Sequence, residues 1–284
     1  MIGRWVLLVL AFAMQALTVT VAVSQSVLTR EDFTLIQDFE DTTSRSFAEH
    51  FANMVHQFEF CLGTQEVCKV LLQKRMGNFY LFDERPKSTF QSSKAATEAI
   101  TLVLKQFQEA SGLQRRLGQP QGTSDYIYLV FVEPELAEYY FDIFAKAHII
   151  HKDFGLSSSE KKQRVELFKY FIDQQLPCIF ISSIYPDNTI RDTYIWVRTE
   201  LDEVLMRQCV AEEFYNSFGL DEGVEVEHLF AYEFSHKAGD TSLSEFDLLL
   251  LKILYSDELP LGSEHENTMA IVEKMVLEAR SAYQ

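Results

Sequence analysis

The spacing of apolar residues along the chain follows two periods, one typical of helices and one typical of strands. Apolar positions at helical spacing predict helices over about 44–58, 64–76, 92–110, 134–150, 157–176, 201–220, 246–255 and 264–283. Runs rich in β-branched and aromatic residues predict strands over 78–83, 125–133, 178–183 and 193–198. These elements predict an α+β fold in which a small mixed sheet packs with several helices.

Turn and cap residues refine the second half of this pattern. Pro186, Asp187 and Asn188 form a turn signal between the last two predicted strands, which are therefore expected to pair as a hairpin. Ser242 and Glu245 have the spacing of a capping box for the helix over 246–255, whose apolar run predicts burial on nearly all sides.

The first 24 residues have the pattern of a secretory signal peptide. Arg4 supplies the positive end, 6–16 the apolar centre, and Ala22-Val23-Ser24 a small-residue cleavage site. The alternative is an uncleaved membrane anchor. Export would leave a mature chain over 25–284, with no later run apolar enough to span a bilayer, so we expect the mature chain not to span the membrane.

The four cysteines predict disulfide bonds in an exported chain. Four cysteines allow three connectivities. We favour Cys61 with Cys68, where Gly63 allows a turn, and Cys178 with Cys209. The alternative is that some of them are buried free thiols.

The chain is strongly acidic, with a formal net charge of -17. Between Glu200 and Glu258 there are fifteen acidic residues and three basic ones. Such a field repels phosphate backbones and anionic lipid, so nucleic-acid binding is disfavoured and a basic ligand or protein partner fits better. The alternative is that the acidic surface serves solubility.

The stretch C-V-A-E-E-F-Y-N-S-F-G-L-D-E, which begins at Cys209, has the spacing of a zinc-peptidase helix without its histidines. In the signature H-E-x-x-H-x-x-G-x-x-H, two ligands one turn apart face the metal and the glutamate activates water. The motif helix is predicted from Leu201 to Leu220. The three ligand positions of the signature are occupied by Glu212, Asn216 and Glu222. Glu213 is at the position of the catalytic base, and Gly219 is the turn glycine.

A helical wheel places the two ligand positions inside the helix on one apolar face. That face comprises Leu201, Leu205, Cys209, Glu212, Asn216 and Gly219. Glu213 and Ser217 lie to one side, so Glu212 is predicted to be the less exposed glutamate. A disulfide from Cys209 to Cys178 would hold the helix against the sheet.

The candidate metal ligands form an oxygen-only set, namely Glu212, Asn216, Asp221 and Glu222. We expect no cofactor; if an ion does bind, oxygen ligands favour calcium, magnesium or manganese over zinc. The segment 221–240 has no clear periodicity and is expected to wrap the site. His228 and His236 within this segment are the histidines that could serve as zinc ligands if they reach the motif helix.

The second half of the chain resembles a bacterial exported family called domain of unknown function 2927. The resemblance rests on Cys178, the strand pair, C-V-A-E-E-F-Y-N-S-F-G-L and the later L-S-E-F-D-L-L-L-L-K-I-L-Y-S-D-E-L-P-L-G. It covers about 126–262, within one domain that also has a helical part over about 28–76 and a terminal helix over about 264–283. Asn216 stands where the family usually has Gln, and Asp221-Glu222 replaces an Asn-Asp pair. The resemblance implies no established activity.

The order of helix, Gly-Leu turn, irregular segment and buried helix is also similar to the metzincin peptidases, with Phe234 near the place of their methionine turn. This implies a zincin-like fold with a degenerate active site. Two hypotheses follow. The chain is an exported binding or envelope-associated module without catalysis, or it is a peptidase-like hydrolase with Glu213 as general base and Glu212 as a ligand or partner carboxylate.

Overall fold

The structure is a computed structural model of the 284-residue chain. It describes residues 27–38, 44–56, 61–62, 73–74, 79–84, 90–111, 125–133, 135, 158–220 and 242–284. The predicted helix over 134–150, the wrapping segment over 221–240 and the signal peptide lie outside these ranges, apart from Glu135.

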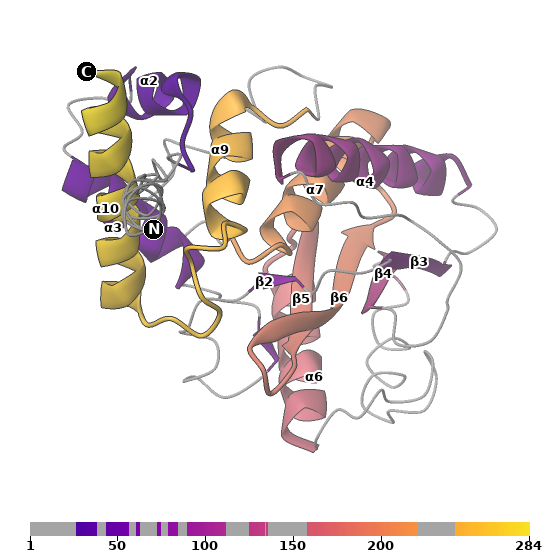
Figure 1. The fold of residues 1–284 in the computed structure, drawn as a ribbon. Helices are drawn as coiled ribbons and strands as arrows, with labels where there is room; N and C mark the ends of the chain where they lie inside the picture. The colour runs from indigo at the N-terminus through magenta and orange to yellow at the C-terminus, as the bar shows by residue number, and fades with distance from the viewer. Residues whose placement is uncertain are drawn as a thin grey trace, which may run out of the picture.

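A mixed sheet forms the centre of the described fold (Figure 1). Its strands are β1 (Cys61–Leu62), β2 (Gln73–Lys74), β3 (Phe79–Glu84), β4 (Asp125–Val132), β5 (Cys178–Ile184) and β6 (Thr189–Arg198). The order across the sheet is β1-β5-β6-β4-β3, and β2 pairs with the start of β6. Only the β5–β6 pair is antiparallel among the described pairs, which confirms the predicted hairpin.

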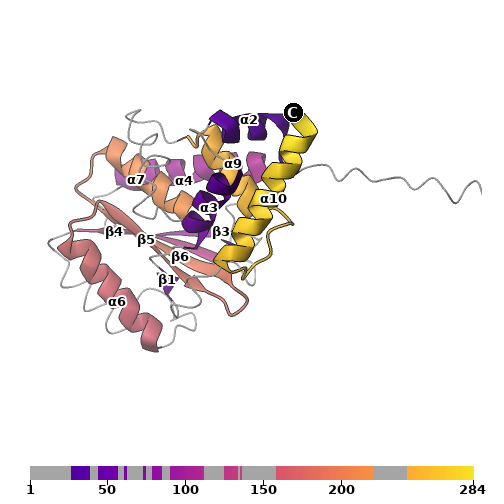
Figure 2. The same cartoon turned by 90° about the vertical axis from the view of Figure 1, so that its left-hand side faces the viewer.

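Helices cover both faces of this sheet. They are α2 (Arg30–Asp38), α3 (Ser44–Val55), α4 (Phe90–Ser111), α6 (Ser158–Asp173), α7 (Glu203–Asn216), α9 (Glu245–Leu254) and α10 (His265–Tyr283). Figure 2 shows α6 alone on one side of the sheet and the other labelled helices on the opposite side. The predicted α+β class with a small mixed sheet is confirmed.

Alternate residues of the central strands enter two separate hydrophobic cores. In β4, Ile127, Leu129 and Phe131 face the large core, whereas Val130 and Val132 face the smaller core under α6. Because side chains alternate across a strand, a strand buried on both faces reads as a continuous apolar run. In β5 the same alternation places Cys178 and Phe180 on the large-core side.

The two ends of the described chain pack together and contribute side chains to the large core. The Tyr283 hydroxyl donates to the carbonyl of Leu28 at 3.1 Å, and the ring Nε2 of His56 shares a hydrogen bond with the Thr268 hydroxyl at 2.9 Å. These contacts join α10 to the segment before α2 and to the end of α3. The N-terminal and C-terminal helices therefore form one layer (Figure 1).

Two predictions of local structure need correction. The helix expected over 64–76 is wrong at its end, because Gln73 and Lys74 pair with β6 as strand β2. The capping box of α9 lies two residues later than predicted: Ser244 is the N-cap and Asp247 its reciprocal partner. Both serines precede an acidic residue by three, so spacing alone did not separate the two candidates.

Replacing Ser244 by alanine should lower the free energy of unfolding by about 1 kcal/mol, because the amide of Asp247 loses its acceptor. Ser242→Ala is the matched control and should cost less than Ser244→Ala, because Ser242 does not cap α9. Urea denaturation of the two variants measures the difference. Equal losses in both would contradict the assignment of the cap.

Candidate functional site

Helix α7 follows β6 directly and packs against both the sheet and α4. The Asp202 carboxylate caps its first turn by accepting the amide of Leu205 at 2.8 Å. Arg207 on the same helix pairs with Glu98 of α4 at 2.5 Å and with Glu203 at 3.0 Å. The hydrogen bond from Arg207 lowers the pKa of Glu98, and the same bond raises the pKa of Arg207.

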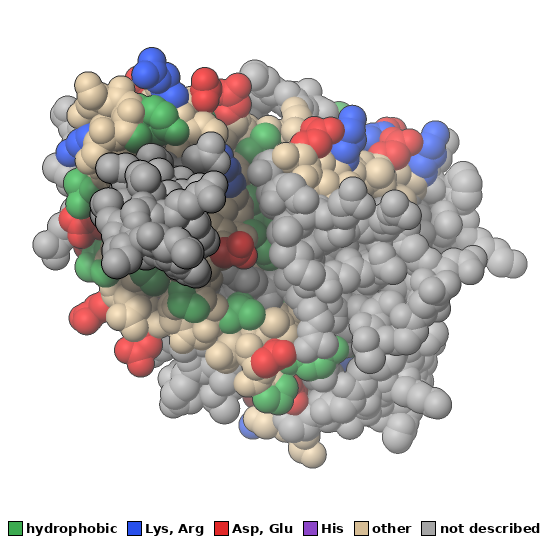
Figure 3. Space-filling view, viewed as in Figure 1, with side chains coloured by type: hydrophobic (Ala, Val, Ile, Leu, Met, Phe, Trp, Pro, Cys, Tyr) green, Lys and Arg blue, Asp and Glu red, His purple; other side chains and the backbone are tan. Residues whose placement is uncertain are grey.

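The outer face of α4 carries charges of both signs in helical pairs. Lys94 lies 3.8 Å from Glu98, and Lys105 lies 3.9 Å from Glu109. Figure 3 shows basic (blue) and acidic (red) side chains alternating along the upper right edge of the molecule, where α4 lies in Figure 1. These exposed pairs contribute little to stability. This part of the surface is solvated and balanced in charge.

The structure corrects the predicted inner face of α7. Leu205 is 41% exposed, so the predicted apolar face is wrong at this residue, whereas Ser217, which was placed to one side of that face, is fully buried. Glu212 and Glu213 are both half-buried. The reason is that α4 and the sheet contact α7 from two directions, which buries more than half of its circumference and leaves no single apolar stripe.

Cys178 and Cys209 form the predicted disulfide, with their Cα atoms 6.1 Å apart. It joins the first residue of β5 to the middle of α7, and both cysteines are buried. The other predicted disulfide, between Cys61 and Cys68, lies outside the described side chains.

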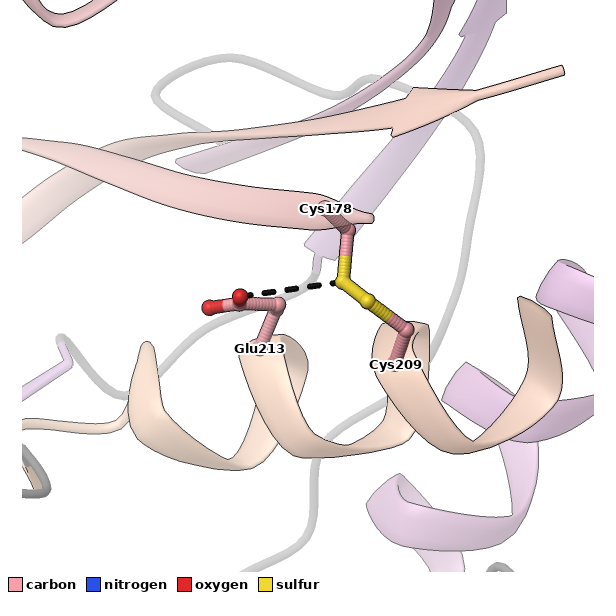
Figure 4. A group of neighbouring side chains, drawn as sticks. All are labelled: Cys178, Cys209 and Glu213. Atoms are coloured by element: carbon pink, nitrogen blue, oxygen red, sulfur yellow. Dashed lines mark hydrogen bonds between the residues drawn. A yellow bond between two sulfur atoms is a disulfide. The ribbon is translucent and has the colours of Figure 1, made fainter. Parts of the chain in front are cut away.

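Glu213 lies one helical turn after Cys209 and faces the same strand (Figure 4). Its Oε2 accepts the backbone amide of Phe180 at 3.2 Å, and its Oε1 lies 3.7 Å from the Sγ of Cys178. Among the described residues, β1 pairs with β5 at Ser182 and Ser183. The Glu213 carboxylate supplies a side-chain acceptor for a backbone amide near the start of β5.

The C-terminal end of α7 is held by aromatic side chains. Phe107 of α4 stacks on Phe218 with ring centroids 4.4 Å apart. The Tyr255 hydroxyl donates to the carbonyl of Phe218 at 2.8 Å. Gly219 follows with a φ of 108°, a conformation that glycine adopts without the strain of a side chain. Gly219 therefore lies at the turn that follows α7.

The structure describes only two of the four residues of the oxygen-only ligand set, Glu212 and Asn216. Asn216 is 6% exposed, and its buried Oδ1 has no hydrogen-bond partner in the described part of the chain. Asp221 and Glu222 lie outside the described residues, as do Phe234, His228 and His236. A cation site with Glu212 and Asn216 thus stays a prediction.

The structure instead brings together Cys178, Cys209 and Glu213. Their candidate ligand atoms all lie within 4.8 Å of one another, and no other such group occurs among the described residues. Sequence reasoning assigned Glu213 a catalytic role and missed its contact with Cys178. The available signal was the four-residue spacing from Cys209 to Glu213, which places both on one side of a helix.

A family model described as "Protein of unknown function (DUF2927)" matches residues 47–274, so the chain belongs to this family. The match extends well beyond the segment over 126–262 that carries the sequence resemblance, and it includes most of α3, all of α4 and about half of α10. No curated protein and no solved structure matches the chain. Within the described ranges, no helix has the length and apolarity to cross a membrane.

Removing the disulfide with the double change Cys178→Ala, Cys209→Ala should lower the free energy of unfolding by about 3–4 kcal/mol. The estimate follows from the 31-residue separation, because the cross-link restricts the unfolded chain. Chemical denaturation of the oxidised protein and the variant measures the loss. A variant as stable as the parent would show that the cross-link contributes nothing.

The Glu213 side chain should stabilise the fold through its acceptor atom rather than its charge. Glu213→Ala should cost about 1–3 kcal/mol, because the Phe180 amide loses its partner. Glu213→Gln keeps a carbonyl oxygen and should cost less than half as much. Hydrogen exchange at the Phe180 amide should accelerate in the alanine variant alone, and Glu212→Ala, which leaves that amide paired, is the control.

Proposed function

We propose that this protein is an exported binding or envelope-associated module without catalytic activity. The observation that carries the proposal is the state of Glu213, which occupies the base position of the peptidase-like motif. Its carboxylate accepts the Phe180 amide and lies against the disulfide, so it links α7 to β5. A general base must instead present a free oxygen to a reacting water.

The surface before and at the start of α7 supports a basic and partly apolar partner. Glu200 and Glu203 are exposed there, and Val204 and Leu205 are 43% and 41% exposed beside them. Acidic and apolar side chains side by side favour a peptide that combines lysine or arginine with apolar residues. The Arg198 and Arg207 partners of these glutamates reduce the local charge without removing it.

Export is supported by two independent features of the chain. The first 24 residues have the charge and apolar pattern of a signal peptide. The Cys178–Cys209 disulfide is of a kind that persists in oxidising compartments. The zincin-like relationship belongs to the same proposal, and it rests on the motif spacing and the Gly219 turn.

The partner hypothesis predicts selective binding of a basic amphipathic peptide. A peptide that alternates lysine and leucine should bind, whereas its glutamate-leucine counterpart should not, because the acidic surface attracts only the first. The double change Glu200→Gln, Glu203→Gln should weaken binding more than the matched change Glu266→Gln, Glu273→Gln on α10. Isothermal titration at two salt concentrations measures both effects.

The hydrolase hypothesis is tested on the same preparations. Peptide-library cleavage by the wild-type protein that disappears in Glu213→Gln, while that variant keeps its fold, would establish a rebuilt active site and overturn the proposal. If the two pairs of glutamate changes weaken peptide binding equally, the assignment of the contact surface to Glu200 and Glu203 is wrong, whatever the cleavage result.

A further inference from the structure

We propose that reduction of the Cys178–Cys209 disulfide creates a binding site for a thiophilic divalent cation such as zinc, with Glu213 as the third ligand. The site differs from the oxygen-only set in every residue. It also does not depend on the proposed binding function, because Cys178 and Cys209 are buried, whereas Val204 and Leu205 of the proposed contact surface are exposed.

The geometry of the three residues matches a metal site on rigid elements. Cys209 and Glu213 are one turn apart on α7, the spacing by which paired helix ligands face one metal. Cys178 approaches from β5 on the opposite side (Figure 4). The ligand atoms already lie within 4.8 Å of one another, and two thiolates on tetrahedral zinc lie about 3.8 Å apart, given zinc–sulfur bonds of about 2.3 Å.

The donor set selects among cations. Two thiolates and one carboxylate carry three negative charges, and soft sulfur ligands favour zinc over calcium or magnesium. Three protein ligands leave the fourth tetrahedral position for water. Half-buried Glu213 provides the route to solvent, whereas the two sulfurs are buried.

A second observation supports Glu213 as a ligand. The Phe180 amide binds its Oε2 and thereby leaves Oε1 directed at the Sγ of Cys178. Backbone groups that orient a ligating carboxylate in this way are a usual part of metal sites. The strand amide thus fixes the carboxylate before any metal arrives.

The redox step determines when the site exists. A dithiol reductant supplies two electrons and two protons, which reduce the two sulfurs to thiols while the reductant becomes a disulfide. Zinc then displaces both thiol protons as it binds. The disulfide and the metal are mutually exclusive, so the oxidised protein has no such site and serves as its own control.

The experiment uses the full mature chain with Cys61→Ser and Cys68→Ser, so that only Cys178 and Cys209 supply sulfur. The protein is reduced with a phosphine under nitrogen, and zinc is titrated in competition with a chromophoric chelator. We expect one zinc per chain in the reduced protein and none in the oxidised protein. Cobalt should give a thiolate charge-transfer absorption under the same conditions.

Variants assign the ligands. Cys209→Ser should abolish binding, and Glu213→Gln should weaken it by at least about tenfold, because the isosteric amide still accepts the Phe180 amide but lacks the charge. Glu212→Gln is the matched control and should bind as the parent does. Equal affinities of the two glutamine variants would overturn the role of Glu213.

Circular dichroism separates loss of the site from loss of the fold. If the reduced chain unfolds, zinc should restore its helical signal in the parent and fail to do so in Cys209→Ser, because binding free energy becomes folding free energy. A reduced chain that stays folded without binding zinc, or stays unfolded in its presence, would overturn the proposal.

Discussion

The attachment of α7 to the first residues of β5 is the constraint on which the rest of the described fold depends. Two links make it, the Cys178–Cys209 disulfide and the hydrogen bond from the Phe180 amide to Glu213. Both lie near the start of β5, on the face of the sheet that α7 covers. Without Glu213, the Phe180 amide would lose the carboxylate that accepts its hydrogen bond.

Once α7 is fixed, the large core assembles around it. Phe218, just beyond its last turn, stacks on α4 and also receives the hydroxyl of Tyr255, which follows α9. Tyr215 on α7 donates from its hydroxyl to the carbonyl of Asp247 on α9 at 3.3 Å. A helix whose spacing suggested a peptidase centre is therefore the structural centre of the described part of the chain.

Sequence patterns predicted the elements with strong local signals. The strands β4, β5 and β6, the helices α4 and α10 and the Gly219 turn follow from apolar runs and turn residues. The Cys178–Cys209 disulfide was the favoured choice among the connectivities that the cysteine count allows. The short strands β1 and β2 were missed because two-residue strands carry no periodicity and exist only by pairing with β5 and β6.

The site was harder to predict than the fold. A wheel describes one helix in isolation, whereas the burial of α7 is set by α4 on one side and β5 on the other. Ser217 is buried and Leu205 exposed for this reason, against their polarity. Glu213 accepts a hydrogen bond from the backbone amide of Phe180. Every residue except proline has such an amide, so the pattern of side chains could not predict this contact.

The contacts between the two ends of the chain also determine when the N-terminal layer can form during synthesis. Leu28 and His56 leave the ribosome more than 200 residues before their partners Tyr283 and Thr268, which are 255 and 212 positions later. Contacts at such separation form late, since the closure of long loops must precede them. The N-terminal layer is therefore completed only after the last helix has been synthesised, so this layer is the last part of the described fold to form.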